Sequence, residues 1–508
     1  MKKAKKFLVG LLAFASVSAF AFGVVGCDNN KTNTGTGGKP NSGGANGVPA
    51  LQYTLSDDGT YYSVTGIGSC ADTALIIPET YNNLPITTIA EYALTGQVFT
   101  SVTIPNSITE IGNWALGNCD NLTEITIPGS VATMGESIFY GCGNLTSATI
   151  ENGITTIADQ MFYDCNNLTS VTIPTSVTGI GRSAFLYCNG LKNVYYTGDV
   201  ADWCNIVFDE ASENPLSFGA DLYIDGEKTT SIVIPDTVTN IGDYAFYGAN
   251  FTGVTIGSLV TAIGTHAFEE CYFLAEVYNK SALNIALGQS GNGYVGNYAL
   301  TIHTEPYESK ISTDNNGYIL YTDDEEKIIV GYTGKETQLN LPTGATGIKC
   351  YAFAKREDLT SVSLPESLRK IGRAAFKDCK GLTEIIIPDQ VITIGGYAFD
   401  SCMALTNVTI GEAVATIEER AFQSCTGLES IMISTSVNFM GTGAFNTCVR
   451  LEEILYKGTS KQWSQITIEE ANDDLKNTKR YYYTESSLTG TGRYWRYENG
   501  EIVKWEQV

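Results

Sequence analysis

Histidine and the motifs of common enzymes are almost missing from this sequence. Only two histidines occur among 508 residues, and there is no G-x-S-x-G, H-E-x-x-H or P-loop motif. No C-x-x-C pair indicates a zinc site, and no pair of carboxylates stands out as a general acid and base. We therefore expect a protein that is not an enzyme, with no cofactor, no metal and no catalytic residue.

Cations are also scarce, and they are not gathered into a block beyond the first six residues. The chain has 31 Lys and Arg against 55 Asp and Glu, which gives a formal net charge of −24. Phosphate backbones and anionic lipid headgroups attract basic surfaces. Nucleic acid and anionic membrane surfaces are therefore poor partners for the body of the protein.

What the sequence does contain is a unit of about 23 residues, repeated along most of its length. The step shows in Cys119, Cys142, Cys165 and Cys188, and again in Cys379, Cys402, Cys425 and Cys448. Twelve copies begin near Ile86, Thr109, Ala132, Thr155, Thr178, Thr239, Thr261, Thr346, Arg369, Ile392, Ala415 and Asn438. Such a period is typical of a solenoid, because one unit cannot bury its apolar side alone and neighbouring coils must stack.

Within one copy the pattern predicts a short strand followed by a tight turn. Residues 122–127 alternate between apolar and polar and end at Pro128, which cannot donate to a ladder. The segment that ends at Cys188 is too short for a full helix, so we expect one helical or 3₁₀ turn there. Gly112 and its equivalents prefer a turn residue, although Ala158 and Glu418 fill the same slot in other copies.

These repeats resemble the bacterial leucine-rich repeats of the BspA-like (TpLRR-type) surface proteins. Their pattern L-x-x-V-x-I-P-x-x-V-x-x-I-G-x-x-A-F-x-x-C is matched over roughly residues 86 to 460. The resemblance implies a β-rich α/β fold, a right-handed leucine-rich repeat solenoid with one parallel strand per coil. It also implies exposure on a bacterial cell surface and a role in binding and adhesion.

The N-terminal residues read as an export signal of a lipoprotein. Residues 1–26 combine a positive end with an apolar stretch, and Cys27 follows Val24, Val25 and Gly26 in what looks like a lipobox. We expect a lipid on Cys27; an ordinary signal peptide or an uncleaved membrane helix is the alternative. Residues 27–50, rich in Asn, Gly, Ser and Thr, are then a flexible tether to the bacterial membrane.

The rest of the chain divides by its departures from the repeat. We predict an N-terminal cap at 51–85, a first repeat block at 86–271 with an insert at 195–231, an irregular connector at 272–345, a second block at 346–460 and a C-terminal cap at 461–508. Trp203 and Trp463 occupy matching inserts, and we read them as lids on a coil in preference to a ligand platform. Asp314, Asn316, Asp323 and Asp324 lack the spacing of a calcium loop, so we expect a solvated turn.

Most of the 13 cysteines are explained by the repeat, since nine occupy one buried slot. Stacked side chains at one slot point the same way, so we expect reduced thiols, and a disulfide framework is the alternative.

One outward position of each strand is the candidate binding surface. Threonine fills it in four coils of the first block before Tyr195, as on any exposed strand. In the second block it holds Ile386, Met432 and Leu455, and three outward apolar groups in one row predict a patch for a partner. The expected partners are proteins or glycans of a host or neighbouring cell. The alternative is an envelope structural protein without a dedicated ligand.

Overall fold

The computed structural model describes residues 51–70, 73–485 and 491–507, in two compact units. The first unit contains described residues up to 154 together with 158–168, and the second contains 155–157 and residues from 169 onward. The boundary falls inside the predicted first block. The predicted signal segment, Cys27 and the tether lie outside the described residues. Among the residues described, no helix is long and apolar enough to cross a bilayer.

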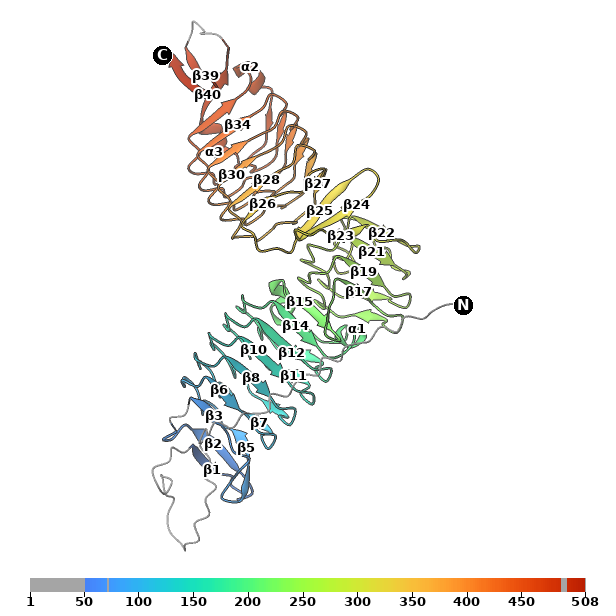
Figure 1. Ribbon diagram of the computed structural model, residues 1–508, viewed down its shortest axis with the longest axis vertical. Helices are drawn as coiled ribbons and strands as arrows, with labels where there is room; N and C mark the ends of the chain where they lie inside the picture. Colours follow the sequence, from blue (N-terminus) through green and yellow to red (C-terminus); the bar gives the residue numbers. More distant parts are fainter. Residues whose placement is uncertain (1–50, 71–72, 486–490, 508) are drawn as a thin grey trace. The chain divides into compact units, whose positions relative to one another are not determined.

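The fold is a leucine-rich repeat β-solenoid of about 18 turns, mostly strand with few helices, as the sequence predicts (Figure 1). In the first unit one row of strands consists of β3 (Ala74–Ile76), β6 (Ser101–Thr103), β8 (Glu124–Ile127) and β10 (Ser147–Ile150). A second row consists of β5 (Leu84–Ile89), β7 (Glu110–Ile111) and β9 (Thr133–Met134). Strands β1 (Gln52–Leu55), β2 (Tyr62–Gly66) and β4 (Thr80–Tyr81) precede or flank this second row.

In the second unit the longer strands up to the connector are β12 (Ser170–Ile173), β14 (Asn193–Tyr196), β15 (Asp221–Ile224), β17 (Ser231–Val233), β19 (Gly253–Ile256), β21 (Glu276–Asn279) and β22 (Thr301–His303). The short strands beside them are β11 (Thr156–Ile157), β13 (Gly179–Ile180), β16 (Glu227–Lys228), β18 (Asn240–Ile241) and β20 (Ala262–Ile263). The insert holds α1 (Val200–Trp203) and two 3₁₀ turns, η1 (Ala211–Glu213) and η2 (Pro215–Phe218).

The connector forms three antiparallel strands, β23 (Ile311–Thr313), β24 (Tyr318–Thr322) and β25 (Lys327–Tyr332). The later coils supply β26 (Gln338–Asn340), β28 (Ser361–Ser363), β30 (Glu384–Ile386), β32 (Asn407–Thr409), β34 (Ser430–Ile433), β36 (Glu453–Tyr456) and β38 (Lys479–Tyr483). Their short strands are β27 (Gly347–Ile348), β29 (Lys370–Ile371), β31 (Thr393–Ile394), β33 (Thr416–Ile417), β35 (Phe439–Met440) and β37 (Thr467–Ile468). The chain ends with α2 (Ser460–Trp463), α3 (Asp473–Asn477) and the hairpin β39 (Gly492–Glu498) and β40 (Glu501–Gln507).

The strands pair in parallel with a register that repeats the 23-residue step. Ser147 of β10 lies opposite Glu124 of β8, and Asn407 of β32 lies opposite Glu384 of β30. Segments outside the sequence pattern also form coils, because β15 pairs in parallel with β14, β22 with β21 and β38 with β36. This explains why the solenoid has more turns than the twelve copies visible in the sequence.

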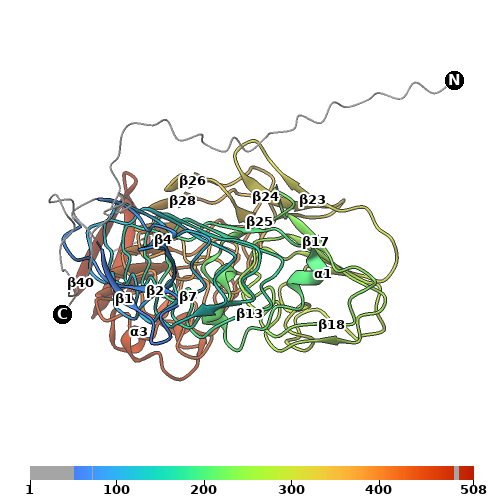
Figure 2. The ribbon, with the colours of Figure 1, turned by 90° about the horizontal axis from the view of Figure 1, so that it is seen from below.

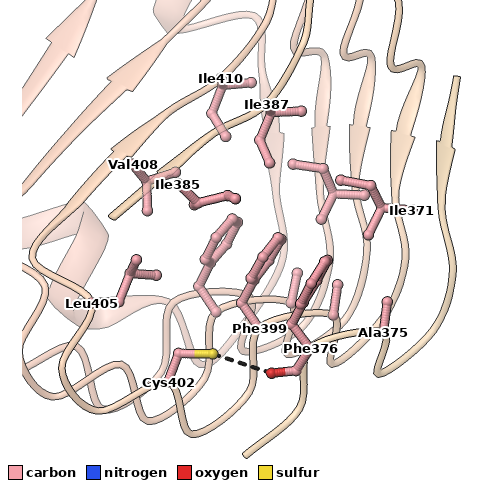
Figure 3. Packing of buried hydrophobic residues seen from close by; sticks show 14 of the residues in the cluster. Ile371, Ala375, Phe376, Ile385, Ile387, Phe399, Cys402, Leu405, Val408 and Ile410 are labelled. Atoms are coloured by element: carbon pink, nitrogen blue, oxygen red, sulfur yellow. Dashed lines mark hydrogen bonds between the residues drawn. The ribbon is translucent and has the colours of Figure 1, made fainter. Parts of the chain in front are cut away.

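The core of the later coils is a ladder of identical side chains. Phe353, Phe376, Phe399, Phe422 and Phe445 stack with ring centroids 5.1–5.3 Å apart. The ladder cysteines are free, buried thiols that each bond to an earlier coil, as Cys402 does by donating to the carbonyl oxygen of Phe376 at 3.2 Å (Figure 3). The slot therefore selects a small apolar group that can also satisfy a buried carbonyl.

The turn before each ladder cysteine differs from the prediction of a helical or 3₁₀ turn. Ser183 and Tyr187, five and one positions before Cys188, have left-handed backbones with φ of 54° and 65°. Backbone N–H groups in this turn donate to the next coil, as Ser137 does to Asp159 at 2.9 Å. Two left-handed residues interrupt any continuous helix, so a third row of hydrogen bonds between coils takes its place.

The glycine of the repeat is needed for close packing between coils. A Cβ on Gly112 would lie 2.5 Å from the backbone nitrogen of Glu91, and one on Gly372 would lie 2.6 Å from that of Cys350. Neither glycine has a positive φ. The sequence rightly indicated that the slot does not require a left-handed residue, and the structure gives the reason that glycine is common there.

The coil at residues 270–275 is tied to the coil at 349–355 across the connector. The Tyr272 and Tyr351 rings stack at 4.4 Å, and Lys355 forms an ion pair with Glu270 at 3.0 Å. Lys349, which is buried, donates from Nζ to the carbonyl oxygen of Tyr272 at 2.7 Å. Removal from water lowers the pKa of Lys349 to about 8.

Candidate functional site

The predicted row of outward apolar residues is only partly exposed. Ile386 is 67% exposed, but Met432 is 7% and Leu455 4% exposed, because Trp495 of the terminal hairpin packs on both. The Trp495 indole N–H donates to the carbonyl oxygen of Tyr456 at 2.9 Å. The prediction that Met432 and Leu455 form a free contact surface with Ile386 is therefore wrong.

The reason lies in the direction taken by the C-terminal residues. β39 pairs with β38, and β40 pairs with β39, so the last sheet continues beyond the final coil. This hairpin places Trp495 over the outward face, where Lys504 reaches back to Glu453 at 2.6 Å. Met432 and Leu455 are apolar because they receive the protein's own C-terminal strands.

The two inserted tryptophans are buried as well. The Trp203 side chain is inaccessible and donates from its indole N–H to the carbonyl oxygen of Ala245 at 2.7 Å. Trp463 is 8% exposed and meets Tyr456 edge to face, with ring centroids 5.2 Å apart. Neither ring is free to stack on a ligand, so both act as lids on the coils that they cover.

Aromatic rings do gather on the turns of the first unit, which the sequence did not indicate. Tyr92, Trp114, Tyr140 and Tyr163 form a continuous stack with centroid distances of 4.4–6.3 Å. The spacing along the chain changes from 22 to 26 to 23 residues because the stack moves from one turn position to another. Since each inner ring is covered by its neighbours on both sides, the stack offers edges more than faces to a ligand.

The strongest candidate site is a cleft of about 540 Å³ in the second unit. One wall contains the beginnings of β15 and β17 and the residues before β19. The other wall contains β23, β24 and the end of β25. Figure 2 shows β17 close to these three connector strands. The cleft is thus made where the connector folds back beside coils that come earlier in the chain.

The lining is mainly uncharged and rich in hydroxyl groups. Thr230 and Ser231 come from the coil wall, and Ser312 and Thr313 come from β23. Phe273 and other apolar side chains supply the rest of the surface. Such a mixture of apolar surface and a few directed polar groups is typical of ligand sites.

The charged groups of the cleft neutralise each other. Asp221 and Lys228 form an ion pair with an N–O distance of 2.6 Å, and they are the charged side chains in the lining. No group of His, Cys, Asp and Glu able to hold a metal ion occurs in the part of the chain that the structure describes. Binding here would depend on hydrogen bonds and apolar contact, without a strong charge of either sign.

A buried carboxylate holds the connector wall in place. Glu276 of β21 is 2% exposed, and it accepts hydrogen bonds from the Ser309 hydroxyl at 2.5 Å and the Lys310 backbone N–H at 2.8 Å. The Tyr307 hydroxyl donates to the same carboxylate at 3.4 Å. A buried carboxylate needs such donors, so the segment before β23 is anchored to the coil and does not hang free.

Strand β24 of the connector is buried on both faces, which also fixes the wall. Tyr318 and Leu320 of β24 enter the core of the later coils. Ile319 and Tyr321, which alternate with them, join Ala275 in a separate cluster against the earlier coils. Period-two alternation thus places one strand between two cores.

The carboxylate of Asp314 organises the acidic turn of the connector. The Asp314 carboxylate accepts from the backbone N–H groups of Asn316 and Tyr318, both at 2.9 Å. These are the bonds of an ordinary turn before Gly317, whose φ is 89°.

The cleft could not be located from the sequence. The hydroxyl residues that line it stand at ordinary exposed strand positions. The two walls lie about 80 residues apart in the sequence, and local patterns of hydrophobicity do not report contacts over that separation. The only signal in the sequence was the loss of the repeat at 272–345, which indicated that the regular stack of coils is interrupted there.

Several solved structures are similar to the chain. A leucine rich cell surface protein from Faecalibacterium prausnitzii A2-165 is 21% identical, with 86% of this chain and 99% of that chain covered and a TM-score of 0.34. The pneumococcal vaccine antigen PcpA is 18% identical, with 86% and 92% covered and a TM-score of 0.33. The leucine rich repeat protein TpLRR of T. pallidum is 13% identical, with 79% and 87% covered and a TM-score of 0.15.

The sequence matches no curated protein. The model of the BspA type leucine rich repeat region matches residues 87–214, 217–288 and 346–472, which is more than half of the chain. The repeat pattern, the parallel register and the stacked core all agree with that match. The chain belongs to the BspA-type leucine-rich repeat family.

Proposed function

We propose that this protein is a lipid-anchored receptor on the bacterial cell surface, which recognises proteins or glycans outside the cell without chemistry. The family typically provides a non-catalytic binding scaffold. The observation that carries the proposal is the cleft, because it is a formed hollow whose two charged side chains neutralise each other.

The anchor is proposed from the N-terminal sequence. Val24, Val25, Gly26 and Cys27 form the expected processing site, and a diacylglyceryl thioether on Cys27 would hold the solenoid at the membrane through the tether at 27–50. Cys70 is disulfide-bonded, whereas the ladder cysteines are free.

Labelling with a palmitate analogue tests the anchor. The full chain, produced in a bacterium that processes lipoproteins, should take up the label and remain with the membrane. Cys27→Ala should lose the label and be released. Mass spectrometry of the mature N-terminus provides the check, and an unmodified Cys27 would contradict the anchor.

A binding array tests recognition. The full chain is presented to matrix proteins, mucin, and neutral and charged polysaccharides, with a heat-unfolded sample as the control. Saturable binding to at least one class supports a receptor. Binding to none of them would favour an envelope structural protein without a dedicated ligand.

A further inference from the structure

We propose that the cleft between the β15–β19 coils and the connector strands binds a short, neutral oligosaccharide. This inference rests on the proposed recognition function and names the site and the class of ligand. It is carried by the free hydroxyls of the two walls, the apolar surface between them and the absence of unpaired charge in the lining.

The free hydroxyls face the cleft from both sides. Thr230 and Ser231 on the coil wall, and Ser312 and Thr313 on the connector wall, have exposed side chains that make no side-chain hydrogen bond to another described residue. Other polar residues nearby are occupied, as Thr252 is by the carbonyl oxygen of Thr230 at 3.1 Å. Hydroxyl groups both donate and accept, which suits a ligand whose own hydroxyls do the same.

The apolar part of the lining gives a place for the C–H face of a sugar ring. Phe273 is half-buried and joins Ile311 and Ile319 at the edge of the small core behind the cleft. Gly331 makes room for the ring, because a Cβ there would lie 2.5 Å from Phe273 Cε1. The ring is therefore held by the connector and still reaches the cleft.

The charges exclude the main competing small ligands. A phosphate or carboxylate would need a free cation, but Lys228 already pairs with Asp221 at 2.6 Å. A cationic ligand would find the same carboxylate occupied. The Glu276 carboxylate, which lies behind this wall, is buried and saturated by Ser309, Lys310 and Tyr307.

The size agrees with a short oligosaccharide. A volume of about 540 Å³ lies within the range of roughly 300–1,000 Å³ usual for small-ligand sites, and it is too small for a folded domain. An extended peptide remains the competing ligand, since β23 is the last strand of its sheet and has an open edge. The lining favours the sugar because its open side-chain groups are hydroxyls, while a peptide would be held by backbone bonds to β23.

The test uses the full chain, a panel of neutral gluco-, galacto- and manno-oligosaccharides, and a charged and a peptide panel beside it. Ser312→Arg places a long side chain in the cleft from the middle of β23. Ser363→Arg makes the same change at an exposed strand position of β28, away from the cleft lining. Far-UV circular dichroism and the unfolding temperature show that both variants fold.

We expect at least one neutral oligosaccharide to bind, with affinity reduced at least tenfold by Ser312→Arg and unchanged by Ser363→Arg. Binding should vary little between about 50 and 500 mM salt, because no ion pair to the ligand is screened. Phe273→Leu, which keeps an apolar group of similar size, should weaken binding severalfold and serves if Ser312→Arg fails to fold.

Three results would overturn the inference. These are equal affinity of Ser312→Arg and the native chain for the sugar, binding confined to charged glycans, and cleft-dependent binding of peptides alone. In each of these the receptor function survives, since the chain still binds a ligand. Binding to no panel and no macromolecule overturns both proposals.

Discussion

The coils of residues 346–460 and those of residues 195–345 both stack parallel strands, but the step from strand to strand is constant only in the later coils. In the later coils the same phenylalanine, cysteine and strand positions recur, and their rings stack at nearly constant distance. In the earlier region the coils carry an insert, two 3₁₀ turns and a three-stranded connector. The comparison teaches that regular repeats build a uniform stacked core, while the interruptions create the cleft.

The largest expected effect on stability comes from a substitution in the regular core of the later coils. Phe399→Ala removes a fully buried ring from the middle of the ladder and leaves a cavity between Phe376 and Phe422. We expect a loss of about 3–5 kcal/mol in the free energy of unfolding. Denaturant unfolding measures it, with Phe273→Ala as the matched change in the irregular region.

Phe273 is only half-buried, so its removal should cost clearly less stability while it weakens ligand binding. A loss at Phe273 equal to that at Phe399 would contradict the division between a regular core and an irregular binding region.

The next effect concerns the covered end of the later coils. Trp495→Ala removes the ring that buries Met432 and Leu455 and deletes the bond to Tyr456. We expect about 3 kcal/mol of local destabilisation, confined to the last coils and the hairpin. Hydrogen exchange should speed up in β34, β36 and β38 and stay unchanged in β28. Uniformly faster exchange would show that the hairpin supports the whole array.

An effect of similar size, spread over a range of pH, tests the tie between the two regions through the charge of Lys349. Burial lowers its pKa from 10.5 to about 8, so the unfolded chain binds the proton more tightly. The neutral amine is favoured in the folded state. The stability that this neutral amine contributes is fully present above pH 10.5 and is lost as the pH falls through 8. The free energy of unfolding therefore decreases by about 3 kcal/mol over this range.

The measurement is the difference in unfolding free energy between the native chain and Lys349→Met from pH 7 to 10. That difference should change in favour of the native chain as the pH rises. Because other groups titrate in both proteins, the difference isolates Lys349. A difference independent of pH would mean that Lys349 keeps its charge and its ordinary pKa in the folded protein.

The smallest effect is expected at the exposed end of the outward row. Ile386→Ser changes a side chain that is 67% exposed, so the unfolding free energy should move by no more than about 0.5 kcal/mol. Leu455→Ser, the same kind of change at the covered end, should cost several times more because Leu455 is 4% exposed. Thermal unfolding of the two variants would show equal shifts if the hairpin did not cover Leu455.

Much of the fold could be predicted because every coil has to bury the same apolar positions against its neighbours. The 23-residue step fixes the parallel register, and the alternation in residues 122–127 fixes which side of β8 is buried. The left-handed turns gave no such signal, because Trp114 and Gln160 occupy positions with φ of 55° and 54° where glycine or asparagine would be expected. Their conformation is imposed by hydrogen bonds between coils.

The candidate site was harder to predict, for a related reason. The apolar outward residues Met432 and Leu455 are visible in the sequence, but their partner Trp495 lies some tens of residues away on a hairpin whose direction no local pattern sets. The cleft also depends on distant residues, since Ser231 and Ser312 line it together from two segments of the chain and Glu276 anchors the connector beside the earlier coils. Long-range contacts decided both surfaces.

In the later coils, the hydrogen bond from each ladder thiol to a phenylalanine carbonyl has a consequence for how such an array can change in length. Every interior coil of residues 376–448 meets its neighbours through the same ring, the same sulfur and the same register. Duplication or deletion of one whole 23-residue copy would join surfaces that already fit, and this block of coils would lengthen or shorten without a new core. An insertion of any other size has no such interface, and it would have to leave the stack as a loop.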